Sequence, residues 1–198
     1  MIENAFSVPI LLDNYPIDSQ TQDSLVDLAQ QHLDYHGLEI GAAQSTASYF
    51  RQVHEIAQFK DLSEYMTELA NKLWISYGLS SRYEPIISET WINKHSNGGA
   101  TMPHIHSGSM ISASYYFKFE QGNGNIKFTN PLEYHQCHEL RETDNDITVE
   151  LEQFDIVMFP GILKHYTEAN TLQTDRYVLT FNFGHQDRKP VRYNFESR

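Results

Sequence analysis

The chain has 198 residues, which is enough for one domain with a hydrophobic core that needs no disulfide bonds. Hydrophobic residues make up 40% of the sequence and aromatic residues 13%, which excludes an intrinsically disordered protein. The 14 Lys and Arg residues against 26 Asp and Glu residues give a net charge of −12. Because such a field repels phosphate backbones, we do not expect a nucleic-acid partner.

The cysteine content and the hydropathy of the chain bear on its location. The single cysteine, Cys137, has no partner for an internal disulfide, which suits a reducing compartment. No apolar run approaches the roughly 18 residues of a membrane helix, and no basic segment leads into an apolar run as in a signal peptide. We therefore expect a cytoplasmic protein without a membrane partner, forming a single domain over residues 1–198.

Residues 1–83 are expected to be mainly helical. Apolar residues recur at helical spacing in two segments, 21–35 and 62–74. Asp61 followed by Glu64 resembles a capping box and predicts the start of the second helix, and Gly78 predicts its C-terminal end.

Residues 84–198 are expected to form short β-strands. Apolar and small residues alternate with the others from 111 to 119, which predicts a strand with one face in the core. The expected strands are 86–92, 111–119, 126–128, 147–151, 154–159 and 177–183. Many short strands with glycine-rich turns are typical of a sandwich, barrel or jelly roll, here of the mainly β (α+β) class with the N-terminal helices packed on one sheet.

Three histidines in this strand-rich part are candidate metal ligands. His104 and His106 are two residues apart, so on an extended backbone both imidazoles point to the same face. His165 follows a later strand, and a jelly roll brings strands that are distant in sequence side by side. Imidazole suits iron, and three protein ligands leave open positions for a co-substrate and oxygen. Taken alone, His-x-His is also compatible with unrelated surface or core histidines.

A candidate anion-binding residue follows these histidines. Arg176 lies eleven residues after His165 and opens the last strand, where a guanidinium can form a bidentate pair with a carboxylate. Thr180 and Asn182 share one face of that strand and can add hydrogen bonds. The alternative is an ordinary surface arginine beside Asp175.

An ordered set of motifs runs from Trp91 to Phe183. Its members are Trp91-Ile92-Asn93, Pro103-His104-Ile105-His106, Ser112-Ala113-Ser114-Tyr115-Tyr116, Phe128-Thr129-Asn130-Pro131, Phe154-Asp155, Phe159-Pro160, His165, and Arg176 with Thr180-Phe181-Asn182. In this order the motifs resemble those of the 2-oxoglutarate- and Fe(II)-dependent oxygenases of bacteria and tailed phages, which are related to the prolyl-hydroxylase group. Ala113 stands where the family pattern has Gly.

The resemblance implies a double-stranded β-helix (jelly roll) core in residues 84–198 that carries the metal site. It also implies an enzyme that uses Fe(II), 2-oxoglutarate and O2 and hydroxylates an unidentified small-molecule or peptide substrate, releasing succinate and CO2. By this resemblance His104 and His165 bind iron, and Arg176 holds the distal carboxylate of 2-oxoglutarate. Tyr115 or Tyr116 is expected to hydrogen-bond the same co-substrate, with Thr180 and Asn182 nearby.

The main departure from the family pattern lies at His106. The family has Asp or Glu at this position, so His106 either completes a site of three neutral imidazoles or leaves the third position to water or an anion. A second register pairs His106 with Gly108, and a vacancy there can admit halide, so hydroxylation and halogenation both stay open.

Two alternatives come from other functional classes. A cupin-type jelly roll that binds or isomerises a sugar or small ligand would explain Gly98 with His104 and His106. Cupins, however, carry Glu where this chain has Met110 and Ile111, and they have no need of Arg176. A non-catalytic interaction module would leave the three histidines without a shared purpose.

The segment 135–138 is expected to be a solvated loop. The oligomeric state stays open, with a homodimer as the commonest assembly.

Overall fold

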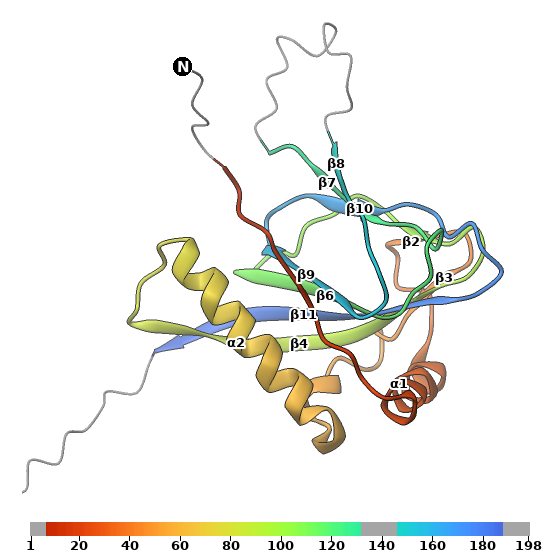
Figure 1. Cartoon of the computed structure of the whole chain (residues 1–198), viewed down its shortest axis with the longest axis horizontal. Helices are drawn as coiled ribbons and strands as arrows, with labels where there is room; N and C mark the ends of the chain where they lie inside the picture. The colour runs from red at the N-terminus through yellow and green to blue at the C-terminus, as the bar shows by residue number, and fades with distance from the viewer. Residues whose placement is uncertain (1–6, 132–145, 188–198) are drawn as a thin grey trace, which may run out of the picture.

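The computed structural model describes residues 7–131 and 146–187 (Figure 1). The strands are β1 Leu11–Asn14, β2 Glu39–Ile40, β3 Ala43–Ser45, β4 Tyr83–His95, β5 Ala100–Thr101, β6 Ile111–Lys118, β7 Ile126–Thr129, β8 Asp146–Val149, β9 Asp155–Pro160, β10 His165–Thr167 and β11 Arg176–Asp187. The helices are α1 Ser19–His32 and α2 Lys60–Ser76, with short 3₁₀ turns η1 Val53–Glu55 and η2 Ala57–Phe59 before α2.

The strands form antiparallel sheets that wind into the predicted jelly roll. The main sheet has the order β1-β9-β6-β11-β4-β3, a smaller sheet has the order β10-β7-β8, and β2 pairs with β5. Neighbours in the main sheet are distant in sequence, as β11 lying between β6 and β4 illustrates. This topology is that of a double-stranded β-helix, so the predicted fold class is confirmed.

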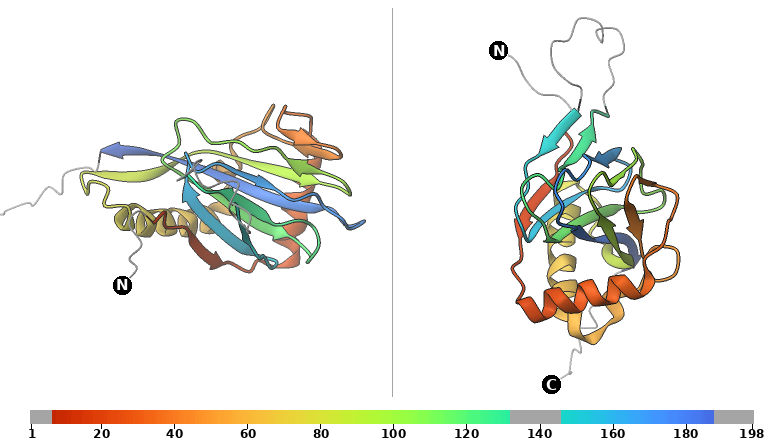
Figure 2. Two further views of the ribbon diagram at one scale, coloured as in Figure 1. Left: turned by 90° about the horizontal axis from the view of Figure 1, so that it is seen from above. Right: turned by 90° about the vertical axis from the view of Figure 1, so that its right-hand side faces the viewer.

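The central strands of the main sheet divide their side chains between two cores. Along β6 the residues Ile111, Ala113, Tyr115 and Phe117 join the larger core, which the helices cover. Tyr116 points to the opposite face and belongs to the second core, together with residues of the smaller sheet. α2 runs along the outer face of the main sheet (Figure 1 and Figure 2). The second core fills part of the space between the two sheets, and the remainder is a cavity.

The helix ends follow local chemistry that was predicted only in part. Asp18 caps α1 by accepting a hydrogen bond from the Thr21 N–H at 2.7 Å, a cap that the sequence analysis missed. The predicted capping box at Asp61 is wrong, because α2 already begins at Lys60, continues directly from η2 and has no side-chain cap. Gly78 adopts the left-handed conformation (φ +66°) just after α2, as predicted.

The first 83 residues contribute more strand than expected. β1 pairs with β9 at one edge of the main sheet, and β3 pairs with β4 at the other. The segment between β3 and α2 contributes Ala47 and Arg51 to the lining of the space between the sheets. The predicted loop at 135–138, with Cys137, lies outside the described residues.

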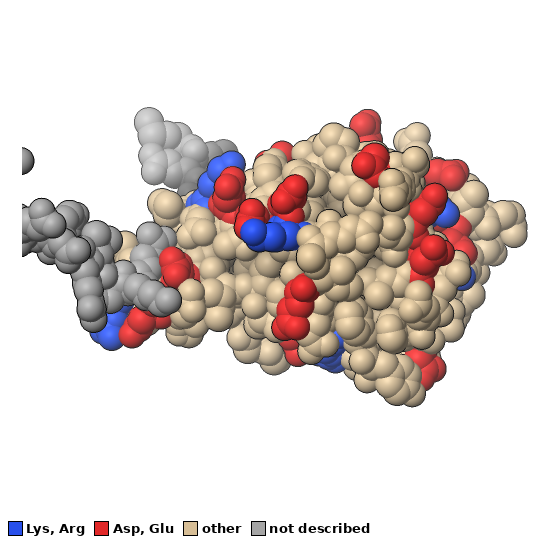
Figure 3. All heavy atoms as spheres, turned by 90° about the horizontal axis from the view of Figure 1, so that it is seen from below, with Lys and Arg blue, Asp and Glu red and all other residues tan. Residues whose placement is uncertain are grey.

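The surface agrees with the acidic composition. On the face shown in Figure 3, Asp and Glu side chains are spread among neutral residues and outnumber Lys and Arg. Within residues 7–131 and 146–187, no helix is both long and apolar enough to cross a membrane.

Candidate active site

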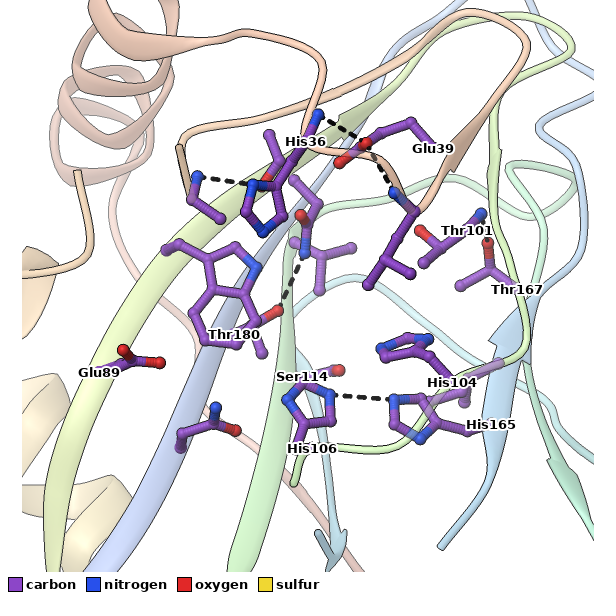
Figure 4. A pocket seen from close by; sticks show the side chains of 18 of the residues that line it. His36, Glu39, Glu89, Thr101, His104, His106, Ser114, His165, Thr167 and Thr180 are labelled. Carbon is purple, nitrogen blue, oxygen red and sulfur yellow. Dashed lines mark hydrogen bonds between the residues drawn. The ribbon is translucent and has the colours of Figure 1, made fainter. Parts of the chain in front are cut away.

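Three imidazoles meet where the chain crosses between the two sheets (Figure 4). The backbones of His104 and His165 form reciprocal hydrogen bonds, N–H to carbonyl, of 2.9 and 3.0 Å. The His106 N–H donates to the carbonyl of Gly161 at 2.8 Å, which fixes the second histidine of the pair beside β9. One nitrogen from each ring lies within 4.8 Å of the corresponding nitrogens of the other two. The cluster found among the described residues consists of histidines alone, so no carboxylate joins it there.

Hydrogen bonds to oxygen orient these rings. Nδ1 of His104 contacts the carbonyl of Met102 at 2.8 Å, and Nδ1 of His165 contacts the carbonyl of Leu163 at 2.8 Å. Because a carbonyl only accepts, each Nδ1 carries the proton and each Nε2 presents its lone pair. Nε2 of His106 lies 3.2 Å from Nε2 of His165, and the Asn182 side chain opposes part of the lowering of the His106 pKa by burial. Such outer partners are typical of metal-binding histidines.

All three rings are in the form that binds a metal. Burial is the main cause that lowers the pKa of His104, and it lowers the pKa of His106 to about 3. Burial followed by the two neighbouring histidines lowers the pKa of His165 well below its ordinary value. The imidazoles are therefore neutral at physiological pH, as metal coordination requires.

The cluster opens into a cavity of about 240 Å³ between the sheets. Tyr116, Thr180 and Asn182 line this cavity, as predicted for co-substrate contacts. Tyr115 does not: it points to the helix side of β6, where its hydroxyl donates to the carbonyl of Tyr15 at 2.7 Å. The expectation that Tyr115 contacts a ligand is therefore corrected in favour of Tyr116, because alternation along the strand allows only one of the two to face the cavity.

Arg176 is fully buried and does not itself line the cavity, but it contacts Thr167, which does. Its Nη2 donates to Thr167 Oγ1 at 3.0 Å, its Nη1 donates to the carbonyl of Gly124, and its Nε has no partner. Burial lowers its pKa only to about 10, so the guanidinium stays charged at neutral pH. Among the described residues no carboxylate lies within ion-pairing distance of it. A buried charge without a counter-ion is costly, which makes this position a natural anion site.

A polar group beside Arg176 was not found from the sequence. His95 pairs directly with Arg176 across β4 and β11, and its Nδ1 is a second buried atom without a partner. Its Nε2 contacts Thr101 Oγ1 at 2.7 Å, and the Thr101 N–H donates to Thr167 Oγ1 at 2.9 Å. Thr167 follows His165 by two residues on β10, so strand spacing was an available signal for it. His95 stands outside every motif, and no pattern marked it.

Part of the chain resembles a known protein family. Residues 89–182 match the model of the family described as "Putative 2OG-Fe(II) oxygenase". No curated protein matches the sequence.

Solved structures share the fold at low identity. The non-haem alpha ketoglutarate dependent epimerase SnoN from nogalamycin biosynthesis aligns with a TM-score of 0.64 and 11% identity, over 96% of this chain and 88% of SnoN. A Pseudomonas putida prolyl-4-hydroxylase aligns with a TM-score of 0.60 and 14% identity, over 92% and 95% of the two chains. HygX from Streptomyces hygroscopicus, solved with nickel, 2-oxoglutarate and hygromycin B, gives 0.57 and 12%, over 89% and 83%.

The matched residues 89–182 include the three clustered histidines and Arg176, so the family match and the cavity concern the same part of the molecule. The family uses Fe(II), 2-oxoglutarate and O2. The resemblance predicted from the motifs is confirmed: residues 89–182 match the model of the 2-oxoglutarate- and Fe(II)-dependent oxygenases.

Proposed function

We propose that this enzyme hydroxylates a small-molecule substrate, with His104, His106 and His165 as the Fe(II) ligands and Arg176 as the partner of the distal carboxylate of 2-oxoglutarate. The observation that supports the proposal is that the candidate metal ligands and the candidate partner of the co-substrate carboxylate lie in one region. Three neutral imidazoles converge at the cavity, and a charged, fully buried guanidinium without a counter-ion lies behind it.

The histidine cluster suits Fe(II). His104 and His165 each have Nδ1 held by a backbone carbonyl and Nε2 free to face the shared centre, so little reorganisation of these two rings is needed on binding. Three protein ligands on one side of an ion leave positions for a bidentate co-substrate and oxygen. When bound, the iron supplies the oxidising chemistry that couples decarboxylation of 2-oxoglutarate, to succinate and CO2, with hydroxylation of the substrate.

The back of the cavity supplies donors for a carboxylate. Thr167 Oγ1 already accepts two hydrogen bonds, from Arg176 and from the Thr101 N–H, so its own proton is free to donate. The unpaired Nε–H of Arg176 is a second donor. If the Thr101 hydroxyl donates to Nε2 of His95, then Nδ1 of His95 carries a proton and becomes a third donor. We propose that Arg176, Thr167 and His95 together hold the distal carboxylate.

Tyr116 adds a donor from the floor of the cavity. Burial raises its pKa to about 12, so the phenol keeps its proton at neutral pH. The hydroxyl can therefore donate to the co-substrate without adding a negative charge beside it. Thr180 lines the same wall, where its hydroxyl accepts a hydrogen bond from Asn93 at 3.0 Å and is held in place.

His106 in place of a carboxylate changes the charge of the site. Three neutral imidazoles leave both positive charges of Fe(II) unbalanced by the protein ligands. 2-Oxoglutarate would neutralise only one of them, because its distal carboxylate is assigned to Arg176. In this proposal His106 fills the third position, so we expect hydroxylation and not halide insertion, which needs that position vacant.

The test is an anaerobic titration of metal-free protein with Fe(II) and 2-oxoglutarate, monitored by the visible charge-transfer band of the chelated oxo acid. We expect a band that needs both additions and disappears in His104→Ala and in His165→Ala. The matched control is His54→Ala, a histidine outside the cluster and the cavity, which should keep the band. Iron binding without a band would favour the cupin alternative, and no iron binding would favour an interaction module.

A further inference from the structure

A pair of opposite charges lies at the mouth of the cavity, away from the buried Arg176. Arg51 comes from the segment between β3 and η1, and Glu89 comes from β4. Both line the cavity, and their side chains are 34% and 41% exposed, so a ligand can reach them from solvent. Glu89 and His36 are seen at the rim in Figure 4. The proposed iron and co-substrate chemistry has no use for this pair.

The guanidinium of Arg51 is fixed before any ligand arrives. Its Nε donates to the carbonyl of Ala47 at 2.6 Å, Nη1 donates to Glu89 Oε2 at 3.0 Å, and Nη2 donates to His36 Nε2 at 3.1 Å. Since an arginine has five N–H groups, two remain for a ligand. Glu89 Oε1 has no ion-pair or hydrogen-bond partner among the described residues. The pair therefore offers both donors and an acceptor to an incoming molecule.

Trp91 connects this pair to the histidine cluster. The Arg51 guanidinium carbon lies 5.6 Å from the centre of the Trp91 ring. The same ring stacks on His106, with centroids 5.6 Å apart and planes 28° apart. A molecule anchored at Arg51 and Glu89 would thus extend along Trp91 toward the metal site.

The arrangement of the two charges selects the kind of ligand. A ligand carboxylate about 4 Å from the Arg51 guanidinium is attracted by it. The Glu89 carboxylate lies 3.0 Å from Arg51, so on the far side it is about 7 Å from the ligand and repels it. Because Coulomb energy falls as 1/r, this repulsion cancels a little over half of the attraction. A cation near Glu89 is opposed by Arg51 in the same way. A zwitterion gains from both charges when its carboxylate faces Arg51 and its ammonium faces Glu89. The volume of about 240 Å³, shared with the co-substrate, limits the part that enters to something small.

We infer that the substrate is a free α-amino acid or a close zwitterionic analogue, bound with its carboxylate on Arg51 and its ammonium on Glu89. Its side chain is the part that extends past Trp91 toward the histidines. This inference rests on the proposed function, because it assigns the substrate end of the same cavity.

The experiment measures binding by calorimetry on the full chain loaded anaerobically with Fe(II) and 2-oxoglutarate. The probes are the twenty common free amino acids, followed by the decarboxylated amine and the desamino acid of the best binder. We expect at least one amino acid to bind, and both truncated probes to bind about tenfold more weakly or worse. If no amino acid binds with a Kd below about 10 mM, which is tenfold above the upper end of ordinary KM values, the inference is wrong. A preference for the decarboxylated amine would also overturn it.

Two variants distinguish charge recognition from a merely structural role of the pair, because they should change the affinity for the desamino acid in opposite directions. Arg51→Gln should weaken the amino acid and the desamino acid alike, by about tenfold or more. Glu89→Gln should weaken the amino acid but strengthen the desamino acid, because it removes a repulsion. The control is Arg82→Gln, since Arg82 is an exposed arginine paired with Asp187 at 3.5 Å outside the cavity, and its loss should change neither value. Unchanged affinities in both pocket variants would contradict the inference.

The charge-transfer band in the same samples separates the two proposals. A normal band without amino-acid binding refutes the substrate class and leaves the oxygenase function in place. Amino-acid binding without a band refutes the proposed roles of the histidines and Arg176 and leaves the substrate site in place.

Discussion

Replacing Arg176 by Met should abolish tight binding of 2-oxoglutarate without unfolding the protein. The guanidinium is fully buried, and its charge has no counter-ion among the described residues. Losing the partner of a buried carboxylate costs about 2–5 kcal/mol, which corresponds to a Kd about 30-fold to several thousand-fold higher. In the ligand-free protein, the unfavourable burial of the charge is removed together with the hydrogen bonds to Gly124 and Thr167, so the net change in stability should be small.

Thermal unfolding of the anaerobic Fe(II) protein with and without 2-oxoglutarate measures this difference. At a 2-oxoglutarate concentration of about 100 times the wild-type Kd, the ligand stabilises the wild type by about 2.7 kcal/mol. With a Kd 30-fold higher, the same concentration stabilises the variant by under about 1 kcal/mol. For a chain of this size the wild-type Tm should rise by about 5–11 °C, and the variant Tm by less than about 4 °C. Equal rises in the two proteins would refute the assignment of Arg176, and Arg51→Gln is the control that should keep the full rise.

Other predictions concern the metal ligands, the backbone and the pH dependence. Asn182→Leu should lower Fe(II) affinity about 10–100-fold in chelator competition, because His106 loses the polar side chain that acts on it from the cavity wall; an unchanged affinity would show that this side chain is dispensable. His106→Asp should retain iron and His106→Leu should not, whereas equal retention in both would mean that the third imidazole does not coordinate. Gly124→Ala should lower the urea-derived free energy of unfolding by at least about 1 kcal/mol more than Gly37→Ala. Both glycines have positive φ, but only at position 124 would a Cβ meet backbone, and equal losses would exclude this clash. Burial, followed by the charge of Arg176, lowers the pKa of His95, so below about pH 6.5 the unfolded state binds more protons than the folded state. Stability of the metal-free protein should therefore fall toward acid by up to about 1.4 kcal/mol per pH unit from this group, and the fall should be shallower in His95→Gln; identical slopes would contradict it.

The fold could be predicted from the sequence where side-chain pattern alone decides structure. The alternation at 111–119 predicted β6 nearly to its ends, because one face of that strand packs under the helices. β1 and β3 were missed, since strands of four and three residues carry too little pattern and exist only through pairing with β9 and β4. The start of α2 was misplaced because the preceding 3₁₀ turn, and no capping side chain, leads into the helix.

The site was predictable where strand spacing fixes the geometry. His104, His106 and His165 come together as their spacing suggested, although their roles as ligands stay a prediction. The sequence could not decide whether Tyr115 or Tyr116 faces the cavity, because this depends on which face of β6 is turned toward the histidine cluster. Arg51 was out of reach, because it arrives from a segment without regular strand or helix pattern, and its position depends on tertiary contacts with Glu89.

The two short strands at the margins of the main sheet also bear on solubility. β9 is an almost continuous apolar strand, from Ile156 to Phe159, that would offer a flat row of unpaired backbone groups to other molecules if it lay at an edge. β1 covers it with a segment of only four residues, of which the last two, Asp13 and Asn14, are polar. A three-residue strand, β3, does the same beside β4. Such brief border strands give another chain little to pair with, so the sheet that holds the site is protected against edge-to-edge aggregation.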